Sequence, residues 1–85
     1  MSKEDLLQAL HAPSHHTLYT EFLNKIQDYE IINICLVDGE LIKIGSGSKL
    51  KKNSIITVTP DFITIQYDSH ITDVMFTAIK YIEYY

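Results

Sequence analysis

The sequence has no arginine and no tryptophan, and it contains one cysteine, two prolines and three glycines among 85 residues. The single cysteine, Cys35, excludes a disulfide within the chain and fits a reducing compartment. All seven basic residues are lysines, so the forked guanidinium that binds phosphate or guanine with two parallel hydrogen bonds is absent. The net charge of −4 argues against a protein that coats duplex DNA through an overall positive field.

Long apolar runs are missing as well. No stretch approaches the roughly 18 apolar residues of a membrane-spanning helix. The first residues, Met-Ser-Lys-Glu-Asp, lack the apolar segment of a signal peptide. With 46% hydrophobic and 21% charged residues, the composition is typical of one small globular domain. Thirteen isoleucines and lysine in place of arginine favour an A+T-rich genome. We therefore expect a cytoplasmic protein with no membrane contact, from a bacterium or from a phage in a bacterial host.

Motifs for catalysis and metal binding are absent from the sequence. There is no Ser-His-Asp order and no pair of carboxylates in a recognisable frame, and Gly45-Ser-Gly-Ser lacks the lysine and helix of a phosphate-binding loop. Pro13 prevents a helical i, i+4 pair among the histidines, which have no cysteine or acidic partner at ligand spacing. These histidines are His11, His15, His16 and His70. We expect no enzyme, no cofactor and no metal site.

The first thirty residues have the pattern of helices. Ser2 and Asp5 form a capping box before a short leucine-rich helix that ends ahead of Pro13. A second helix is predicted from about residue 17 to residue 28. Its apolar stripe places Leu18, Phe22 and Ile26 on one face, with Leu23 beside them.

From residue 31 the apolar residues alternate, which predicts short antiparallel strands. Asp38-Gly39 indicates a two-residue hairpin turn, and residues 46–53 read as an exposed lysine-containing loop. Thr59-Pro60-Asp61 indicates a second turn. The predicted strands cover residues 31–37, 40–45, 54–59, 62–67, 71–76 and 79–84.

Two strands near the end of the chain define the expected faces and edges. On the predicted strand 62–67, Ile63, Ile65 and Tyr67 share one face. On the last strand, Ile79 and Tyr81 are expected opposite Lys80 and Ile82. The strands 71–76 and 79–84 have little chain available to cover them, so pairing with another copy is the simplest way to protect their edges. This predicts a homo-oligomer.

Several short segments resemble the Sm/LSm family and its bacterial branch Hfq. They are Phe22-Leu23-Asn24 followed by Ile26, Leu36-Val37-Asp38-Gly39, Asp61-Phe62 and Ala78-Ile79. The resemblance covers roughly residues 18 to 83. It implies a single Sm-like domain over residues 1–85, mostly β with N-terminal α. In it, a helical segment of one or two helices (1–30) precedes a small, strongly bent antiparallel barrel of five or six strands (31–85). It further implies a closed homo-oligomeric ring that binds single-stranded RNA, or single-stranded DNA, in nucleic-acid processing or regulation.

The chain also departs from the family pattern. Met75-Phe76-Thr77 stands where the bacterial branch carries Tyr-Lys-His for uridine-rich RNA, and the Arg-Gly of eukaryotic members is missing. Either Pro60 or Asp61 occupies the acidic place of the Sm turn, which leaves the register of residues 60–64 open. About ten additional residues, including the lysine loop, separate Gly39 from Asp61. The lost Tyr-Lys-His pattern and the acidic net charge favour an alternative, a protein-interaction scaffold ring that has lost RNA binding.

Two sets of candidate residues follow from the resemblance and the pattern. The candidates for nucleic-acid contact are Phe62, Thr64, Met75, Phe76, Thr77, Lys49, Lys51 and Lys52. The candidates for the oligomer interface are Ile71, Val74, Phe76, Ile79, Tyr81 and Ile82. The alternative for the aromatic residues is a place in the core, and for the lysines a solvated loop tip. Cys35 is expected to be a small buried hydrophobic residue.

Overall fold

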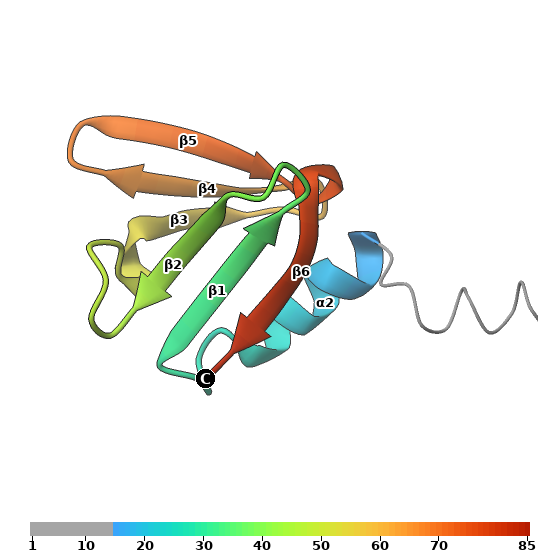
Figure 1. The fold of residues 1–85 in the computed structure, drawn as a ribbon, viewed down its shortest axis with the longest axis horizontal. Helices are drawn as coiled ribbons and strands as arrows, with labels where there is room; N and C mark the ends of the chain where they lie inside the picture. The colour runs from blue at the N-terminus through green and yellow to red at the C-terminus, as the bar shows by residue number, and fades with distance from the viewer. Residues whose placement is uncertain (1–14) are drawn as a thin grey trace, which may run out of the picture.

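The computed structural model describes residues 15–85 and contains one α-helix, six strands and two short 3-10 helices within that range (Figure 1). The helix predicted ahead of Pro13 lies outside the described residues. In chain order the elements are α2 (His15–Lys25), β1 (Ile31–Leu36), β2 (Leu41–Gly45), η1 (Lys52–Ser54), β3 (Ile55–Val58), β4 (Phe62–Tyr67), β5 (His70–Met75), η2 (Phe76–Ala78) and β6 (Ile79–Tyr84). The expected class, mostly β with an N-terminal helix, is confirmed.

The strands form two three-stranded antiparallel sheets, in the orders β2-β1-β6 and β3-β4-β5. Residues 46–54 carry the chain from the first sheet to the second, and η2 carries it back. The β4–β5 hairpin extends away from the helical side of the molecule (Figure 1). Within residues 15–85 the edge strands are β2 and β6 in the first sheet and β3 and β5 in the second.

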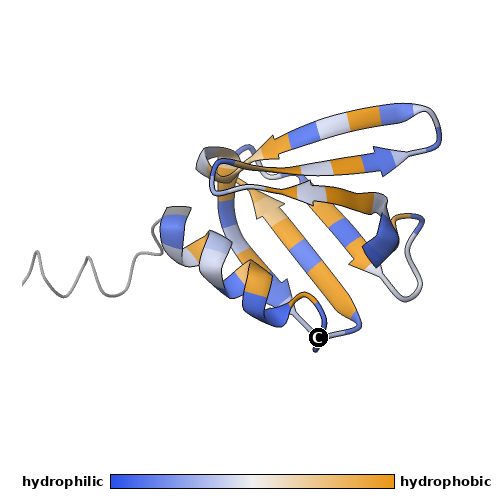
Figure 2. Ribbon diagram, turned by 180° about the vertical axis from the view of Figure 1, so that it is seen from behind, coloured by the Kyte–Doolittle hydropathy of each residue, from blue (hydrophilic) through white to orange (hydrophobic). Residues whose placement is uncertain are grey.

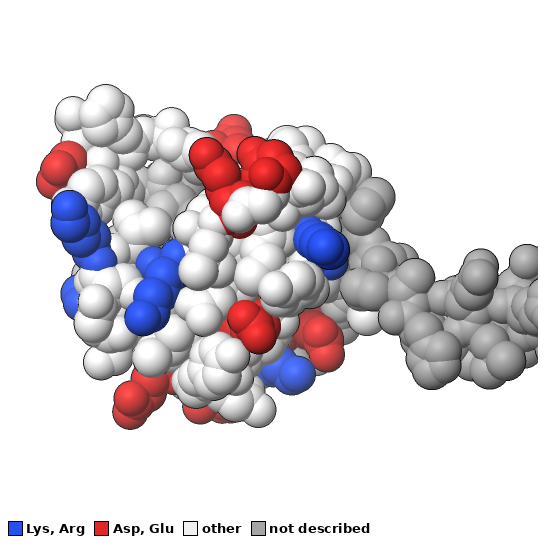
Figure 3. All heavy atoms as spheres, viewed as in Figure 1, with Lys and Arg blue, Asp and Glu red and all other residues white. Residues whose placement is uncertain are grey.

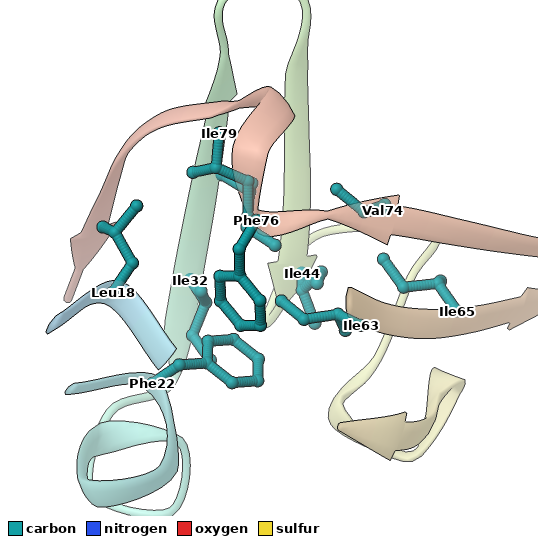
Figure 4. Close-up of a cluster of buried hydrophobic side chains, with 10 residues drawn as sticks. Leu18, Phe22, Ile32, Ile44, Ile63, Ile65, Val74, Phe76 and Ile79 are labelled. Atoms are coloured by element: carbon teal, nitrogen blue, oxygen red, sulfur yellow. The ribbon is translucent and has the colours of Figure 1, made fainter. Parts of the chain in front are cut away.

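The core lies between the two sheets and the helix (Figure 4). Alternate residues of β1 point inward, and Ile32 and Ile34 are fully buried there. Full burial of such a side chain contributes about 1.5–3 kcal/mol. The ten buried hydrophobic residues are Leu18, Phe22, Ile32, Ile34, Ile44, Ile63, Ile65, Val74, Phe76 and Ile79.

The helix α2 closes one side of this core with the stripe predicted from the sequence (Figure 2). Leu18 and Phe22 are buried, and Ile26 is half-buried against the same cluster. Leu23 is exposed. The helix ends three residues earlier than predicted, at Lys25, and a turn follows it.

The turn between β1 and β2 has three residues, so the prediction of a two-residue turn is wrong. The backbone N–H of Leu36 donates to the carbonyl of Glu40, and that of Gly39 donates to the carbonyl of Leu36. Only Gly39 adopts a positive φ, of 94°, while the Asp38 carboxylate accepts a hydrogen bond from the Glu40 backbone. A turn closed by one left-handed glycine is the usual three-residue hairpin loop.

The predicted faces of β6 hold for Ile79 and Lys80 but are reversed for Tyr81 and Ile82. A bulge between Cys35 and Leu36 shifts the register of β6 against β1. Ile82 therefore pairs with Ile34 and is half-buried beside the core, while Tyr81 pairs with Cys35 and points outward. A similar shift in β3 leaves Ile56 about half exposed.

The loop after β2 folds back along the sheet. Gly45 adopts a φ of 119°, and its N–H donates to the carbonyl of Leu50 at 2.8 Å. A Cβ at this position would collide with the carbonyl oxygen of Glu30. Leu50 consequently lies half-buried against the core. Only part of the loop 46–53 is therefore the solvated tip expected from the sequence.

Candidate functional site

Two unpaired sheet edges are the main candidate for function. β5 is one edge of its sheet, opposite β3, and β6 is one edge of the other sheet, opposite β2; β5 and β6 each have six residues. Only the three-residue turn η2 separates them along the chain. An unpaired strand offers a row of N–H and C=O groups to another chain.

The hydrogen bonds of the β4–β5 hairpin define which groups of β5 are free. The N–H of Phe76 donates to the carbonyl of Asp61, and hydrogen-bonded pairs alternate along an antiparallel ladder. By this alternation, Val74 and Thr72 bond inward to Ile63 and Ile65, their partners on β4. The backbone groups of the residues that alternate with Thr72 and Val74 point outward. These residues are Ile71, Asp73 and Met75.

The same argument applies to β6. Ile31 and Tyr85 exchange two backbone hydrogen bonds, of 3.0 and 2.9 Å. Alternation then directs the backbone groups of Glu83 and Tyr81 toward β1, and those of Ile82 and Tyr84 toward the free edge. The two edges thus present matching rows of donors and acceptors.

The candidate interface side chains fall into two groups. Val74, Phe76 and Ile79 are at most 6% exposed and belong to the core of the chain itself. Ile71 and Tyr81 are 63% and 43% exposed, and Ile82 is half-buried. The buried group therefore supports the edges from behind and is not available for side-chain contact with another copy.

The candidate nucleic-acid residues near Phe62 are only partly accessible. Phe62 is half-buried and Met75, its partner on β5, is 43% exposed. Thr64 lies beside them at 8% exposure, and its hydroxyl donates to the Asp73 carboxylate at 2.7 Å. Thr77 is exposed in η2.

Phe76 lies in the core, which is the alternative that the sequence left open for the aromatic residues, so its ring is not accessible for stacking on a base. It is 1% exposed and contacts the ring of Tyr19 edge-on, with the centroids 5.9 Å apart. Its position after β5 suggested a surface residue by analogy with the family. The turn η2 instead directs it under the helix.

The lysines of the loop lie close together in sequence but differ in their surroundings. Lys49 and Lys51 are exposed, and Lys52 is half-buried at the start of η1. The Lys51 ammonium donates to the carbonyl of Gly45 at 3.5 Å, a long hydrogen bond. Lys49 therefore has the greatest freedom to meet a ligand among the three.

Sequence reasoning missed an apolar groove between β2 and the β4–β5 hairpin. Its volume is about 330 Å³. The available signal was Leu50, the only apolar residue of the lysine loop, which lies against the groove. The groove is lined by Ile42, Leu50, Ile65, Tyr67, His70, Thr72 and Val74.

Three tyrosines near the end of the chain have altered acidity. Burial, together with the charge of Glu21, raises the pKa of Tyr84. A hydrogen bond to Cys35 raises the pKa of Tyr81, and a hydrogen bond to Glu83 raises that of Tyr85. In each case the raised pKa favours the neutral phenol over the phenolate.

The histidine, cysteine and acidic side chains do not gather into a metal site. No group of three or more of these residues within 15–85 is arranged to hold a metal ion. His11 lies outside the described residues, and His70 lies at the tip of the β4–β5 hairpin. In the same part of the chain, no helix is long and apolar enough to cross a membrane.

Comparisons with known proteins identify no relative of this chain. No protein-family model, no curated protein and no solved structure matches the chain.

Proposed function

We propose that the chain is an Sm-like subunit that assembles through its free edges into a closed homo-oligomeric ring and binds single-stranded nucleic acid, RNA in the first place. The supporting observation is the pair of unpaired six-residue edges, β5 and β6, on two different sheets. Pairing β5 of one copy with β6 of the next extends both sheets and leaves β6 of the first copy and β5 of the second free for further copies. A head-to-tail contact of this type forms a ring when the rotation between successive copies closes.

The order of elements supports the same proposal. A helix followed by six short antiparallel strands is the order that the resemblance to the family implies. The groove of about 330 Å³ lies along the inner face of β5, where an added strand would cover apolar surface. Coverage of exposed apolar area favours association.

Nucleic acid would be bound by the lysine loop and by the surface around Phe62. Lys49, Lys51 and Lys52 meet phosphate as point charges, while Phe62 and Met75 offer apolar contact to bases. No lysine lies on this part of β4 and β5, which carries Asp73. Recognition there must therefore tolerate sequence.

The experiment combines a mass measurement with a salt titration. Light scattering is expected to give a closed assembly of several copies, and fluorescence anisotropy with labelled oligonucleotides gives the affinity. Log affinity is expected to fall linearly with log salt, with a slope of roughly −0.7 per phosphate contacted on a single strand. In Lys49→Gln/Lys51→Gln/Lys52→Gln the slope is expected to flatten, with equal weakening for all oligonucleotide sequences.

The matched control is Lys25→Gln, a lysine on the far helix that pairs with Glu21 and lies over the Tyr84 ring. It is expected to leave the salt slope unchanged. A monomer at high concentration contradicts the ring, and an affinity unchanged in the triple variant contradicts phosphate contact by the loop.

The second candidate is a scaffold ring that binds protein and not RNA. The acidic neighbours of Phe62, Asp61 and Asp73, favour it because they repel phosphate. Phe62→Ala separates the two: weaker oligonucleotide binding by an intact ring supports base stacking. Lost stability with unchanged affinity per folded ring supports the scaffold.

A further inference from the structure

The outer face of the β2-β1-β6 sheet is a surface that the proposed ring does not use. It consists of the strand residues that alternate with the core residues, and α2 packs on the opposite side of the sheet (Figures 1 and 2). Leu41 and Tyr81 are 58% and 43% exposed on it. Asn33 lies at its centre, and its Oδ1 atom accepts no hydrogen bond within the described part of the chain. The members of the outer face are Ile31, Asn33, Cys35, Leu41, Lys43, Tyr81 and Glu83.

An apolar row crosses the middle of the outer face. Cys35 on the central strand pairs with Leu41 on β2 and with Tyr81 on β6. A hollow of about 330 Å³ lies over these three residues.

Charges of alternating sign surround this row. On one side of it, Asn33 pairs with Lys43 on β2 and with Glu83 on β6. At the other side, near the β1–β2 turn, Glu40 precedes β2 and Lys80 lies on β6, and both line the hollow. Counted from the β1–β2 turn, the β2 side carries the acid Glu40 and then the base Lys43. The β6 side carries the base Lys80 and then the acid Glu83. Figure 3 shows acidic and basic groups around a largely uncharged area over these strands.

We propose that the outer face binds the outer face of a second copy of this chain, about a two-fold axis that lies in the interface parallel to β1. This rotation exchanges the β2 side with the β6 side. Lys43 then meets Glu83 of the partner subunit, and Glu40 meets Lys80 of the partner subunit. Apolar row meets apolar row, and Cys35 lies opposite Cys35 of the partner subunit. At the far end, Tyr85 meets the partner's Gly45, which has no side chain to obstruct it.

The charge pattern of the outer face favours a second copy of this chain as its binding partner. Each copy carries a net charge of −4, so copies repel one another unless the contact supplies opposite charges locally. The pattern is opposite in sign across β1, which makes the face complementary to itself under this rotation. Charge complementarity of this kind fixes the partner and the register of an interface.

The size of the face sets the expected affinity. Three short strands form a contact at the low end of specific interfaces, so a single pair of faces is expected to be weak. The face is separate from the β5 and β6 edges, so the proposal does not depend on ring formation. If rings form, repeated contacts join two of them by multivalency; if they do not, monomers form dimers.

Charge reversal tests the arrangement. Lys43→Glu places like charges against each other twice in the assembly, and we expect the association constant to fall at least about tenfold. Lys43→Glu/Glu83→Lys restores opposite charges about the proposed axis and is expected to recover wild-type association. Sedimentation velocity over a concentration series measures both, and thermal melting of each variant confirms that the fold is retained.

A two-fold axis across the strands would set Lys43 against the partner's Glu40 instead, and the double variant would then stay dissociated. That result overturns the proposed arrangement, as does a Lys43→Glu variant that associates like wild type. In a ring, Lys43→Glu is expected to halve the mass of the assembly while each ring persists. Variants of the β5 edge, in contrast, are expected to lose the ring itself.

Cross-linking provides a second measurement, whose result would not change if Lys43 had only a structural role within its own chain. Cys35 is the only cysteine, and packed sheets lie about 10 Å apart, within reach of a short bismaleimide. We expect covalent dimers from wild type and from the double charge-swap variant, and none from Lys43→Glu. In Cys35→Ser/Ser69→Cys the thiol lies at the β4–β5 hairpin tip, and no dimer is expected. Equal yields from all four proteins would reject the face-to-face contact.

Discussion

At the scale of single residues, Tyr84 combines burial with an unsatisfied hydroxyl. Its Oη atom is buried without a hydrogen-bond partner, while the ring packs against Tyr29 and lies 5.0 Å from the Lys25 ammonium. Burial raises its pKa above the ordinary value of 10.0. Between the ordinary and the raised value the unfolded chain has released this proton and the folded chain retains it, so stability falls as pH rises above about 10.

Tyr84→Phe is therefore expected to raise the free energy of unfolding at pH 7 by about 1 kcal/mol, because it removes an unpaired buried polar group. It is also expected to flatten the loss of stability above pH 10. Urea unfolding followed by circular dichroism from pH 7 to pH 11 measures both effects, with Tyr67→Phe at an exposed tyrosine as control. A variant with the wild-type pH dependence would contradict this account.

Gly45 is a second residue whose identity the tertiary structure requires. Its φ of 119° is strained for other residues, and a Cβ would collide with the Glu30 carbonyl. Gly45→Ala is expected to cost at least about 2 kcal/mol of stability. Gly47→Ala is the matched control, since it has a φ of 80° and open space around it, and about 1 kcal/mol is expected there. Equal losses in thermal or urea unfolding would show that the collision is relieved.

At the scale of elements, the free edge of β5 can be tested without disturbing its hairpin. Met75 has a φ of −72°, which suits proline, and its N–H points away from β4 by the alternation of the ladder. Met75→Pro is expected to abolish ring assembly and to keep the melting temperature of the isolated subunit nearly unchanged. Light scattering and thermal melting measure the two quantities.

Val74→Pro is the contrasting variant. Val74 bonds inward to Ile63, so proline there removes a hydrogen bond of the hairpin and is expected to unfold the sheet. A Met75→Pro protein that assembles like wild type would exclude β5 as the ring edge. If the face-to-face contact of the β2-β1-β6 sheets is present, this variant is expected to stop at dimers.

At the scale of the whole molecule, the distribution of lysines determines the expected specificity. The surface around Phe62 has Asp73 and no lysine, so base contacts rest on apolar and stacking interactions. We expect uridine-rich RNA to be preferred over adenine-rich RNA by less than about tenfold, or ~1.4 kcal/mol. Competition anisotropy with oligonucleotides of equal length tests this expectation. A preference above a hundredfold would require a specific donor that this surface lacks.

The sequence by itself determined the class of the fold and most of its elements. Period-2 alternation placed Ile63 and Ile65 inward on β4, and the i, i+4 stripe placed Leu18 and Phe22 against the core. These patterns are local, because each residue needs only its near neighbours in the chain to define a face.

The tertiary structure alone decided the faces of β6, the choice between core and surface for Phe76, and the placement of β5 and β6 on different sheets. A bulge at Lys80 of β6, opposite Cys35 and Leu36 of β1, moves Ile82 inward and Tyr81 outward, and the residue pattern of β6 does not signal this shift. Phe76 enters the core because η2 turns it under the helix. The sequence indicated that β5 and β6 have exposed edges, but their order within the sheets depends on contacts between segments distant in sequence.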